Sequence, residues 1–261
     1  MNMNDEFFFH EYGQGRPLVI LHGWLGTSDY WLNVAMFLSS FGFRVFAVDL
    51  PNHARSFHTE EFSYEQMSDI MISFCKAKDL QKPILMGHSM GGKLAMKMIE
   101  QEPEYFKAAV IVDIHFREYE MTPFFYQIQK LLLETDLKQF KDLSEFKAYF
   151  LKEGLDQSWV AVLMKNVHYS GNTLQWRSNI PLLAQNTQTM LGSIDVTPHD
   201  LPMLLIRGEK SACVSQEDCQ SFKEIYPNSK VDTIEGADHF VWVDNAPMFL
   251  KHATEFLTMI P

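Results

Sequence analysis

The sequence predicts an α/β protein built on a doubly wound, mostly parallel sheet, with a helical segment inserted into it. Short apolar runs alternate with stretches of helical periodicity, which is the pattern of parallel strands joined by crossover helices. One long segment interrupts this alternation without a buried strand. The length of 261 residues suits one large domain with an insertion and is enough for a sizeable core.

The predicted elements follow one another in order along the chain. A first hairpin is expected around residues 6–9. Apolar runs typical of strands buried on both faces lie at 18–21, 45–48, 84–86, 109–112 and 203–206, and a strand-like run follows at 231–234. Helical periodicity is found at 30–39, 64–77, 90–101 and 216–226, and Pro247 is placed to open a last helix. In such a sheet, functional groups gather at the C-terminal ends of the strands.

Residues 116–184 are predicted to form a helical lid inserted into a core that consists of residues 1–115 and 185–261. Large apolar residues such as Phe124 and Ile128 recur in this segment at helical spacing. An insertion of this length between two strands is typical of a segment that covers an active site. The alternative is that these helices only pack on one another.

Composition and charge exclude some classes of molecule as binding partners of this protein. The net charge of −11, without long acidic runs, disfavours nucleic acids and anionic membranes, because both bind a basic face. The N-terminal segment has no basic region followed by a long apolar stretch, and no segment approaches the ~18 apolar residues of a membrane span. We therefore expect a cytoplasmic protein with no membrane span that acts on a small molecule.

The three cysteines, Cys75, Cys213 and Cys219, are sparse and lack the spacing of metal ligands or redox pairs. We expect them to be small packing residues in a reducing compartment. A dinucleotide-binding glycine fingerprint is also missing from the sequence. The sequence thus predicts neither a metal nor an organic cofactor.

The most informative motif is a G-x-S-x-G box at Gly87 to Gly91, between an apolar strand and an amphipathic helix. A serine on a sharp strand-to-helix turn adopts a strained backbone conformation, so the positions two before and two after it must be small. Gly87 and Gly91 meet this requirement. The turn exposes the hydroxyl and directs the N-terminus of the helix at an oxygen that becomes anionic in acyl transfer. Ser89 is therefore the predicted nucleophile.

Several motifs together resemble the α/β-hydrolase superfamily over essentially the whole chain. They are LHGW at 21–24, DLPNHARS at 49–56, the box around Ser89 and GADH at 236–239. Two further segments, VDI at 112–114 and QWRSN at 175–179, resemble the YbfF-type esterases. This second resemblance implies hydrolysis of carboxylic esters and acyl thioesters, and it implies that Trp176 and Arg177 anchor the lid near the substrate.

The superfamily resemblance also implies an oxyanion hole formed by the backbone N–H groups of Trp24 and Met90. The indole of Trp24 is expected either to line the acyl pocket or simply to pack. His22 and His88 border the nucleophile, and we expect them mainly to brace their loops, with substrate contact as the alternative. The segment 49–56 is expected to shape a turn beside the site.

His239 is the predicted general base. It follows a strand-like run and a turn of small residues, and it lies C-terminal to the other candidates, which matches the chain order nucleophile, acid, histidine. The hydroxyl of Ser89 has too high a pKa to attack unaided, so an imidazole must accept its proton and later pass it to the leaving group.

The triad acid departs from the commonest superfamily pattern. That pattern has an Asp where this chain has Ser211, and a neutral hydroxyl cannot stabilise an imidazolium as a carboxylate can. Asp113 ends the preceding predicted strand at the same edge of the sheet, and the YbfF-type resemblance points to the same residue. Its alternative role is a cap for the chain that enters the lid. The other candidates for the acid are Glu209, Asp218 and, less favourably, Asp238.

The predicted function is therefore that of a serine hydrolase acting on carboxylic esters or acyl thioesters through an acyl-enzyme on Ser89. Perhydrolysis, hydrolysis of a C–C bond or a lyase reaction could use the same triad. A ligand-binding receptor without turnover is the alternative from another class, because a fold does not dictate its function.

Overall fold

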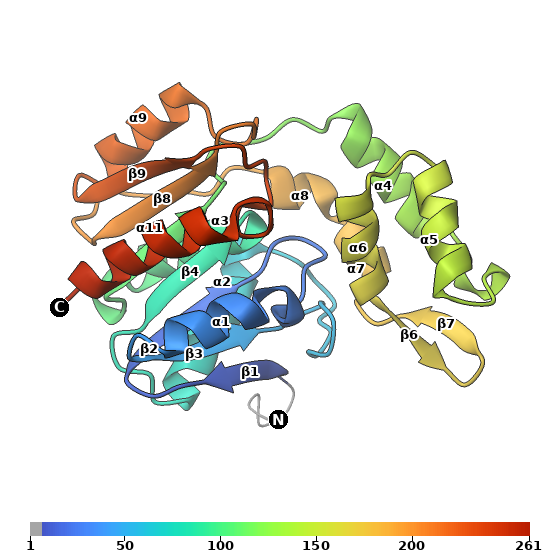
Figure 1. Cartoon of the computed structure of the whole chain (residues 1–261), viewed down its shortest axis with the longest axis horizontal. Helices are drawn as coiled ribbons and strands as arrows, with labels where there is room; N and C mark the ends of the chain where they lie inside the picture. The colour runs from blue at the N-terminus through green and yellow to red at the C-terminus, as the bar shows by residue number, and fades with distance from the viewer. Residues whose placement is uncertain (1–6) are drawn as a thin grey trace.

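The computed structural model describes residues 7–261, and they form a seven-stranded sheet with helices on both faces (Figure 1). The strand order is β1-β3-β2-β4-β5-β8-β9, and only β1 is antiparallel to its neighbour. The strands are β1 (Phe9–Tyr12), β2 (Arg16–Leu21), β3 (Phe43–Val48), β4 (Ile84–His88), β5 (Ala108–Val112), β8 (Met203–Gly208) and β9 (Ser229–Ile234). The predicted doubly wound, mostly parallel sheet is confirmed.

The predicted first hairpin is wrong. β1 pairs with β3 and not with β2, which follows it in the chain. β1 is only partly buried, as suits a strand at the edge of a sheet. The turn after it passes close to the loop before β3, and a Cβ at Gly15, whose φ is +109°, would lie 2.3 Å from the carbonyl oxygen of Gly42. Glu6, where the hairpin was expected to begin, lies outside the described residues.

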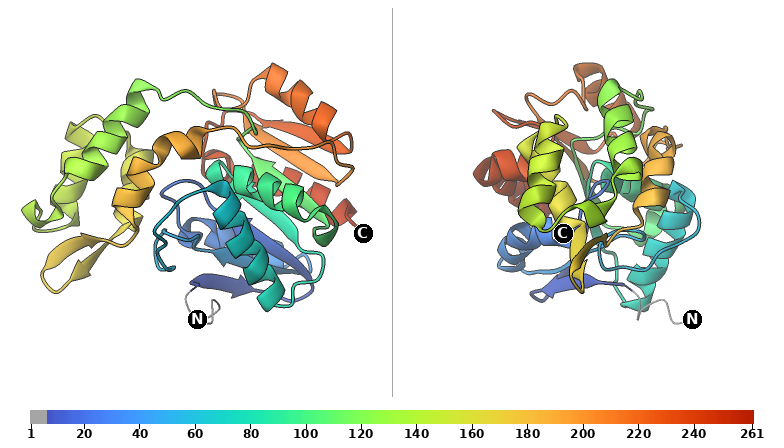
Figure 2. Two further views of the ribbon diagram at one scale, coloured as in Figure 1. Left: turned by 180° about the vertical axis from the view of Figure 1, so that it is seen from behind. Right: turned by 90° about the vertical axis from the view of Figure 1, so that its right-hand side faces the viewer.

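Two apolar cores lie on the two faces of the sheet, because successive side chains of a strand point to opposite faces. In β2, Val19 and Leu21 belong to one core, and Leu18 and Ile20 belong to the other. The first core is covered by α2 (Tyr64–Ala77), α3 (Met90–Gln101) and α9 (Gln216–Ile225), and the second by α1 (Leu32–Ser39) and α11 (Ala246–Met259) (Figure 2). Shorter helical turns are η2 (Ser28–Trp31), η3 (Pro103–Tyr105) and α10 (Val241–Asp244).

The segment between β5 and β8 projects to one side of the sheet (Figures 1 and 2). It contains α4 (Pro123–Glu134), η4 (Leu137–Gln139), α5 (Leu143–Lys152), α6 (Gln157–Lys165), β6 (Val167–Ser170), β7 (Thr173–Trp176), α7 (Ile180–Gln185) and α8 (Thr187–Leu191). The expected helices are present, but the antiparallel pair β6 and β7 was not expected. Only Val167 and Leu174 of this pair are buried, so the sequence carries no strand-like apolar run there.

Helical structure in this segment continues to Leu191, beyond the boundary expected at residue 184. We call residues 116–191 the insertion. Within residues 7–261, no helix is long and apolar enough to cross a membrane.

Candidate active site

Ser89 occupies a sharp turn between β4 and α3. Its φ of 51° and ψ of −122° lie in a region that residues other than glycine rarely adopt. The turn is possible because its neighbours are glycines: a Cβ at Gly87 would lie 2.2 Å from the carbonyl oxygen of Gly91, and a Cβ at Gly91 would lie 2.2 Å from that of Leu21. The expectation that both positions must be small agrees with these contacts.

Asp113 and His239 meet at the C-terminal edge of the sheet. Asp113 directly follows β5 and is fully buried, and its Oδ2 lies 2.8 Å from Nδ1 of His239. A carboxylate only accepts, so Nδ1 carries the proton of this hydrogen bond. The other oxygen, Oδ1, accepts from the backbone N–H of Gly208 at 2.9 Å. The carboxylate is therefore held in place by the neighbouring strand β8 as well as by the imidazole.

Ser211 also contacts the acid. Its hydroxyl donates a hydrogen bond to Oδ2 of Asp113, the oxygen that accepts from His239. The sequence places Ser211 at the usual position of the acid but does not indicate this role for it. The signal was the position itself, because a residue there faces the same histidine and can hold a carboxylate that comes from another strand.

The other candidates for the acid have different partners. Glu209 and Asp238 accept hydrogen bonds from backbone N–H groups, at 2.9 and 2.8 Å. Asp218 pairs with Arg117 at 2.9 Å and completes the capping box of α9. Among these four carboxylates, the structure brings only Asp113 to the imidazole of the predicted base within residues 7–261.

Burial by itself would lower the pKa of His239, but the neighbouring Cys213 and Asp113 have the opposite effect, and the net pKa is raised above its ordinary value of 6.5. The buried histidines around the site behave differently. Burial lowers the pKa values of His22 and His88, so both rings stay neutral. The predicted base is thus the ring beside Ser89 that most readily takes up a proton.

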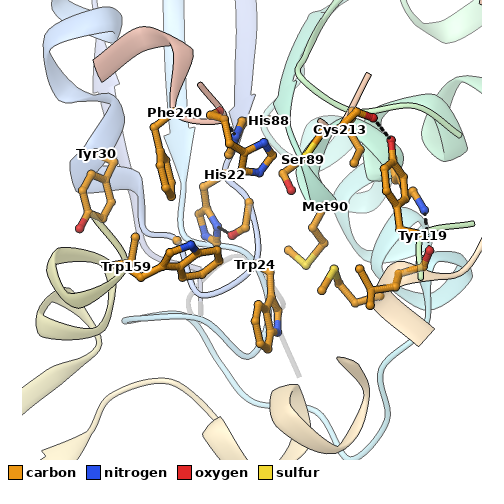
Figure 3. Close-up of a pocket in the computed structure, with 18 of the residues that line it drawn as sticks. His22, Trp24, Tyr30, His88, Ser89, Met90, Tyr119, Trp159, Cys213 and Phe240 are labelled. Carbon is orange, nitrogen blue, oxygen red and sulfur yellow. Dashed lines mark hydrogen bonds between the residues drawn. The ribbon is translucent and has the colours of Figure 1, made fainter. Parts of the chain in front are cut away.

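A cavity of about 240 Å³ lies between the core and the insertion, and both Ser89 and His239 line it (Figure 3). Aromatic rings form much of its wall: Trp24 lies 6.3 Å from Trp159 between ring centroids, and Trp159 lies 6.0 Å from Phe240. The insertion contributes lining residues from α4, α6 and α8, which are Phe125, Trp159, Val162, Met190 and Leu191. The cavity is therefore suited to an apolar group.

Trp24 and Met90 line the same cavity as Ser89. Met90 is the first residue of α3, so its N–H is one of the free donors at a helix N-terminus. In the described part of the chain, the backbone N–H groups of Trp24 and Met90 have no acceptor. Both donors are available to a bound oxyanion.

His22 and His88 line the cavity but are already hydrogen-bonded. His22 donates through Nδ1 to the carbonyl of Gly23 at 2.8 Å and accepts through Nε2 from the N–H of Leu50 at 3.0 Å. His88 donates through Nε2 to the carbonyl of His239 at 3.0 Å. These contacts match the expected bracing role.

The structure places Trp176 and Arg177 elsewhere. Trp176 ends β7 and packs on Phe146 of α5, with ring centroids 5.8 Å apart. The backbone N–H of Arg177 donates to the carbonyl of Asn166 at 2.7 Å. Neither is among the described residues that line the cavity. Their contacts match the packing alternative, in which the helices and hairpin of the insertion support one another.

Known proteins with similar sequences and structures indicate the family of this chain. Residues 16–246 match the family described as alpha/beta hydrolase fold. The sn-1-specific diacylglycerol lipase ABHD11 of Xenopus tropicalis is 29% identical over 93% of this chain and 78% of its own length. A putative esterase/lipase of Haemophilus influenzae is 27% identical over 92% of this chain and 82% of its own. A solved structure described as a marine microorganism esterase has a TM-score of 0.92 and 30% identity, covering 96% of this chain and 99% of that one.

Proposed function

This chain belongs to the α/β-hydrolase family and is an enzyme that hydrolyses ester bonds, and from that premise we propose that it works as a serine hydrolase through Ser89, His239 and Asp113. The observation that carries the proposal is the 2.8 Å contact between Asp113 and His239 at the edge of a cavity into which Ser89 faces from a strained turn. The resemblance to the YbfF-type esterases remains a prediction.

In the proposed mechanism, Asp113 fixes the tautomer of the base. Its carboxylate accepts from Nδ1 of His239, which leaves Nε2 free to take the proton of Ser89. The alkoxide of Ser89 attacks the carbonyl carbon, and the oxygen that becomes negative is stabilised by the N–H groups of Trp24 and Met90. The imidazolium then protonates the leaving group, and a water molecule activated by the same base hydrolyses the acyl-enzyme.

The substrate class follows from the cavity wall. Trp24, Trp159 and Phe240 offer aromatic surface to an acyl group, and Met90 and Met190 add flexible side chains that adapt to different shapes. We infer that the acyl part of the substrate is apolar and that the leaving group is an alcohol or a thiol. The insertion would act as a lid, because it supplies one wall of the cavity.

The decisive experiment is Ser89→Ala. Loss of one hydroxyl from this turn removes the acyl-enzyme but little packing, so we expect ester hydrolysis and labelling by a fluorophosphonate probe to disappear while the circular dichroism spectrum is unchanged. Residual activity above about a thousandth of wild type would contradict the proposal. p-Nitrophenyl esters from acetate to palmitate, tested beside acyl-CoA thioesters, would define the acyl group and the leaving group.

A further inference from the structure

Three groups of different chemistry converge beside Ser89. One ligand atom each of Asp113, Cys213 and His239 lies within 4.8 Å of the other two. The mechanism uses the carboxylate and the imidazole but has no use for the thiol. Cys213 nevertheless lines the cavity, beside Ser89 in Figure 3.

Hydrogen bonds hold the backbone of Cys213 in position. The N–H of Cys213 donates to the hydroxyl oxygen of Ser211 at 3.1 Å, and its carbonyl accepts from the hydroxyl of Tyr119 at 2.8 Å. Ser211 in turn donates to Asp113. The loop after β8 therefore holds the backbone of Cys213 in place beside Asp113, and its thiol lies close to the carboxylate and the imidazole.

Thiolate, imidazole and carboxylate are the side chains that bind zinc in proteins, and three of them with one open position form a common type of site. Metal–ligand distances of about 2.0–2.3 Å correspond to ligand atoms roughly 3.3–3.8 Å apart in a tetrahedron. Atoms that already lie within 4.8 Å of one another need to approach by only about an ångström. A thiolate and a carboxylate would also balance the two charges of the ion, so no net charge would be buried.

We propose that Asp113, Cys213 and His239 form a binding site for a thiophilic divalent ion such as Zn²⁺, and that the bound ion inhibits the enzyme. Binding displaces the proton of the thiol, which leaves to solvent, and the proton of Nδ1 of His239 moves through solvent to Nε2, so the imidazole stays neutral. The imidazole then has a metal in place of its hydrogen bond to Asp113 and can no longer cycle between neutral and protonated forms. The binding part of this proposal stands alone, and the inhibition part rests on the proposed function.

Chelator-treated protein is titrated with Cd²⁺ and with Zn²⁺. We expect a thiolate-to-metal charge-transfer absorption with Cd²⁺ that saturates at one equivalent, and loss of esterase activity with either ion over the same range. Mg²⁺, which prefers oxygen ligands, should do neither. Absence of the Cd²⁺ absorption would overturn the proposal.

Cys213→Ser removes one ligand, and Cys219→Ser on α9, outside the cluster, is the matched control. Each variant is compared with its own metal-free activity. The concentration of Zn²⁺ that halves activity should rise by at least about 10-fold in Cys213→Ser and stay unchanged in Cys219→Ser, because even partners beyond the direct ligands change affinity 10- to 100-fold. Equal sensitivity of both variants would overturn the assignment of the thiol.

Wild-type protein provides a measurement that needs no variant. Zn²⁺ should slow the alkylation of Cys213 by N-ethylmaleimide, and mass spectrometry of the peptide that contains Cys213 measures this rate. Undiminished alkylation at saturating Zn²⁺ would contradict the site. Ser89→Ala separates the two proposals. It should bind Cd²⁺ as wild type does although it has lost esterase activity. Cd²⁺ binding by a wild-type protein that shows no esterase activity would refute the proposed function and leave the metal site standing.

Discussion

At the scale of single residues, the placement of Asp113 matters most for the proposed mechanism. It is fully buried, has a φ of 51°, and accepts hydrogen bonds from His239, Ser211 and Gly208. A non-glycine residue in this conformation is strained, and such strain is concentrated at functional sites. The conformation brings the carboxylate that follows β5 to a histidine that comes from a different part of the chain.

We expect Asp113→Asn to lower kcat by orders of magnitude, since an amide holds the wrong imidazole tautomer and supplies no charge; comparable changes in other triads cost about 10⁴-fold. Steady-state kinetics on a p-nitrophenyl ester would measure this. Ser211→Ala removes one of several hydrogen bonds to Asp113 and should cost far less, roughly 10-fold or below. Near-wild-type turnover in Asp113→Asn would return Glu209 and Asp218 to consideration.

The pH profile depends on His239. Cys213 and Asp113 more than offset the effect of burial and raise its pKa above 6.5. The base must be neutral to accept a proton, so kcat/KM should rise with pH and reach half its plateau above pH 6.5. A midpoint at or below 6.5 in wild type would show that burial dominates.

At the scale of elements, α3 holds the two ends of the insertion as well as the nucleophile. Lys93, on the first turn of α3, is almost fully buried, and its ammonium donates to the carbonyls of Arg117 at 2.8 Å and Leu191 at 3.1 Å, and to that of Gly192. These carbonyls belong to the chain entering the insertion and to the chain leaving it. The helix that carries Ser89 therefore ties down both connections.

Lys93→Met keeps the length of the side chain but leaves these buried carbonyls without their donor, which costs about 1–3 kcal/mol for each unsatisfied group. We expect faster hydrogen exchange and proteolysis near Arg117 and Leu191, with the sheet still protected. Lys97→Met is the matched control, because Lys97 lies one turn further along α3 and pairs with Glu65 instead, at 2.9 Å. Equal protection of the connections in both variants would contradict the role of Lys93.

The elements that the sequence predicts well are those whose pattern is local. The buried strands and the helices α2 and α3 have apolar residues at a clear period, and the structure has them at the expected residues. The position of β1 in the sheet depends on which strand it pairs with, and no local sequence pattern identifies that partner. The pair β6 and β7 is mostly exposed and consequently has no apolar run.

At the scale of the whole molecule, the difference between local patterns and contacts between distant segments explains which residues of the site the sequence identifies. Ser89 and His239 lie in short motifs, so the sequence identifies them. The grouping of Asp113, Ser211 and Cys213 arises because β5 and β8 are neighbours in the sheet, with Val112 opposite Ile206, although the insertion separates them in the chain. Spacing rules for metal ligands assume ligands close in sequence, so the expectation of simple packing for Cys213 followed from that assumption.

The whole fold should also be sensitive to mild acid. Burial lowers the pKa of His53 to about 3, and it also lowers the pKa values of His22 and His88. In the unfolded chain these imidazoles take up protons below about pH 6.5, whereas in the fold they stay neutral. The unfolded state then binds more protons, so the free energy of unfolding falls as pH drops below 6.5, and for His53 the fall approaches about 1.4 kcal/mol per pH unit.

Urea denaturation of wild type and His53→Gln at pH 7.5 and pH 5.5 isolates one of these contributions. Carboxylates with a lowered pKa, such as Asp49, change the stability mainly below pH 5.5, and His239, whose pKa is raised, changes it in the opposite direction to His53. Both contributions are the same in wild type and in His53→Gln, so they cancel in the comparison. Stability lost between pH 7.5 and 5.5 should therefore be about 1.4 kcal/mol smaller in His53→Gln. An equal loss in both proteins would mean that the ring of His53 becomes protonated inside the fold, where its Nε2 has no partner among the described residues.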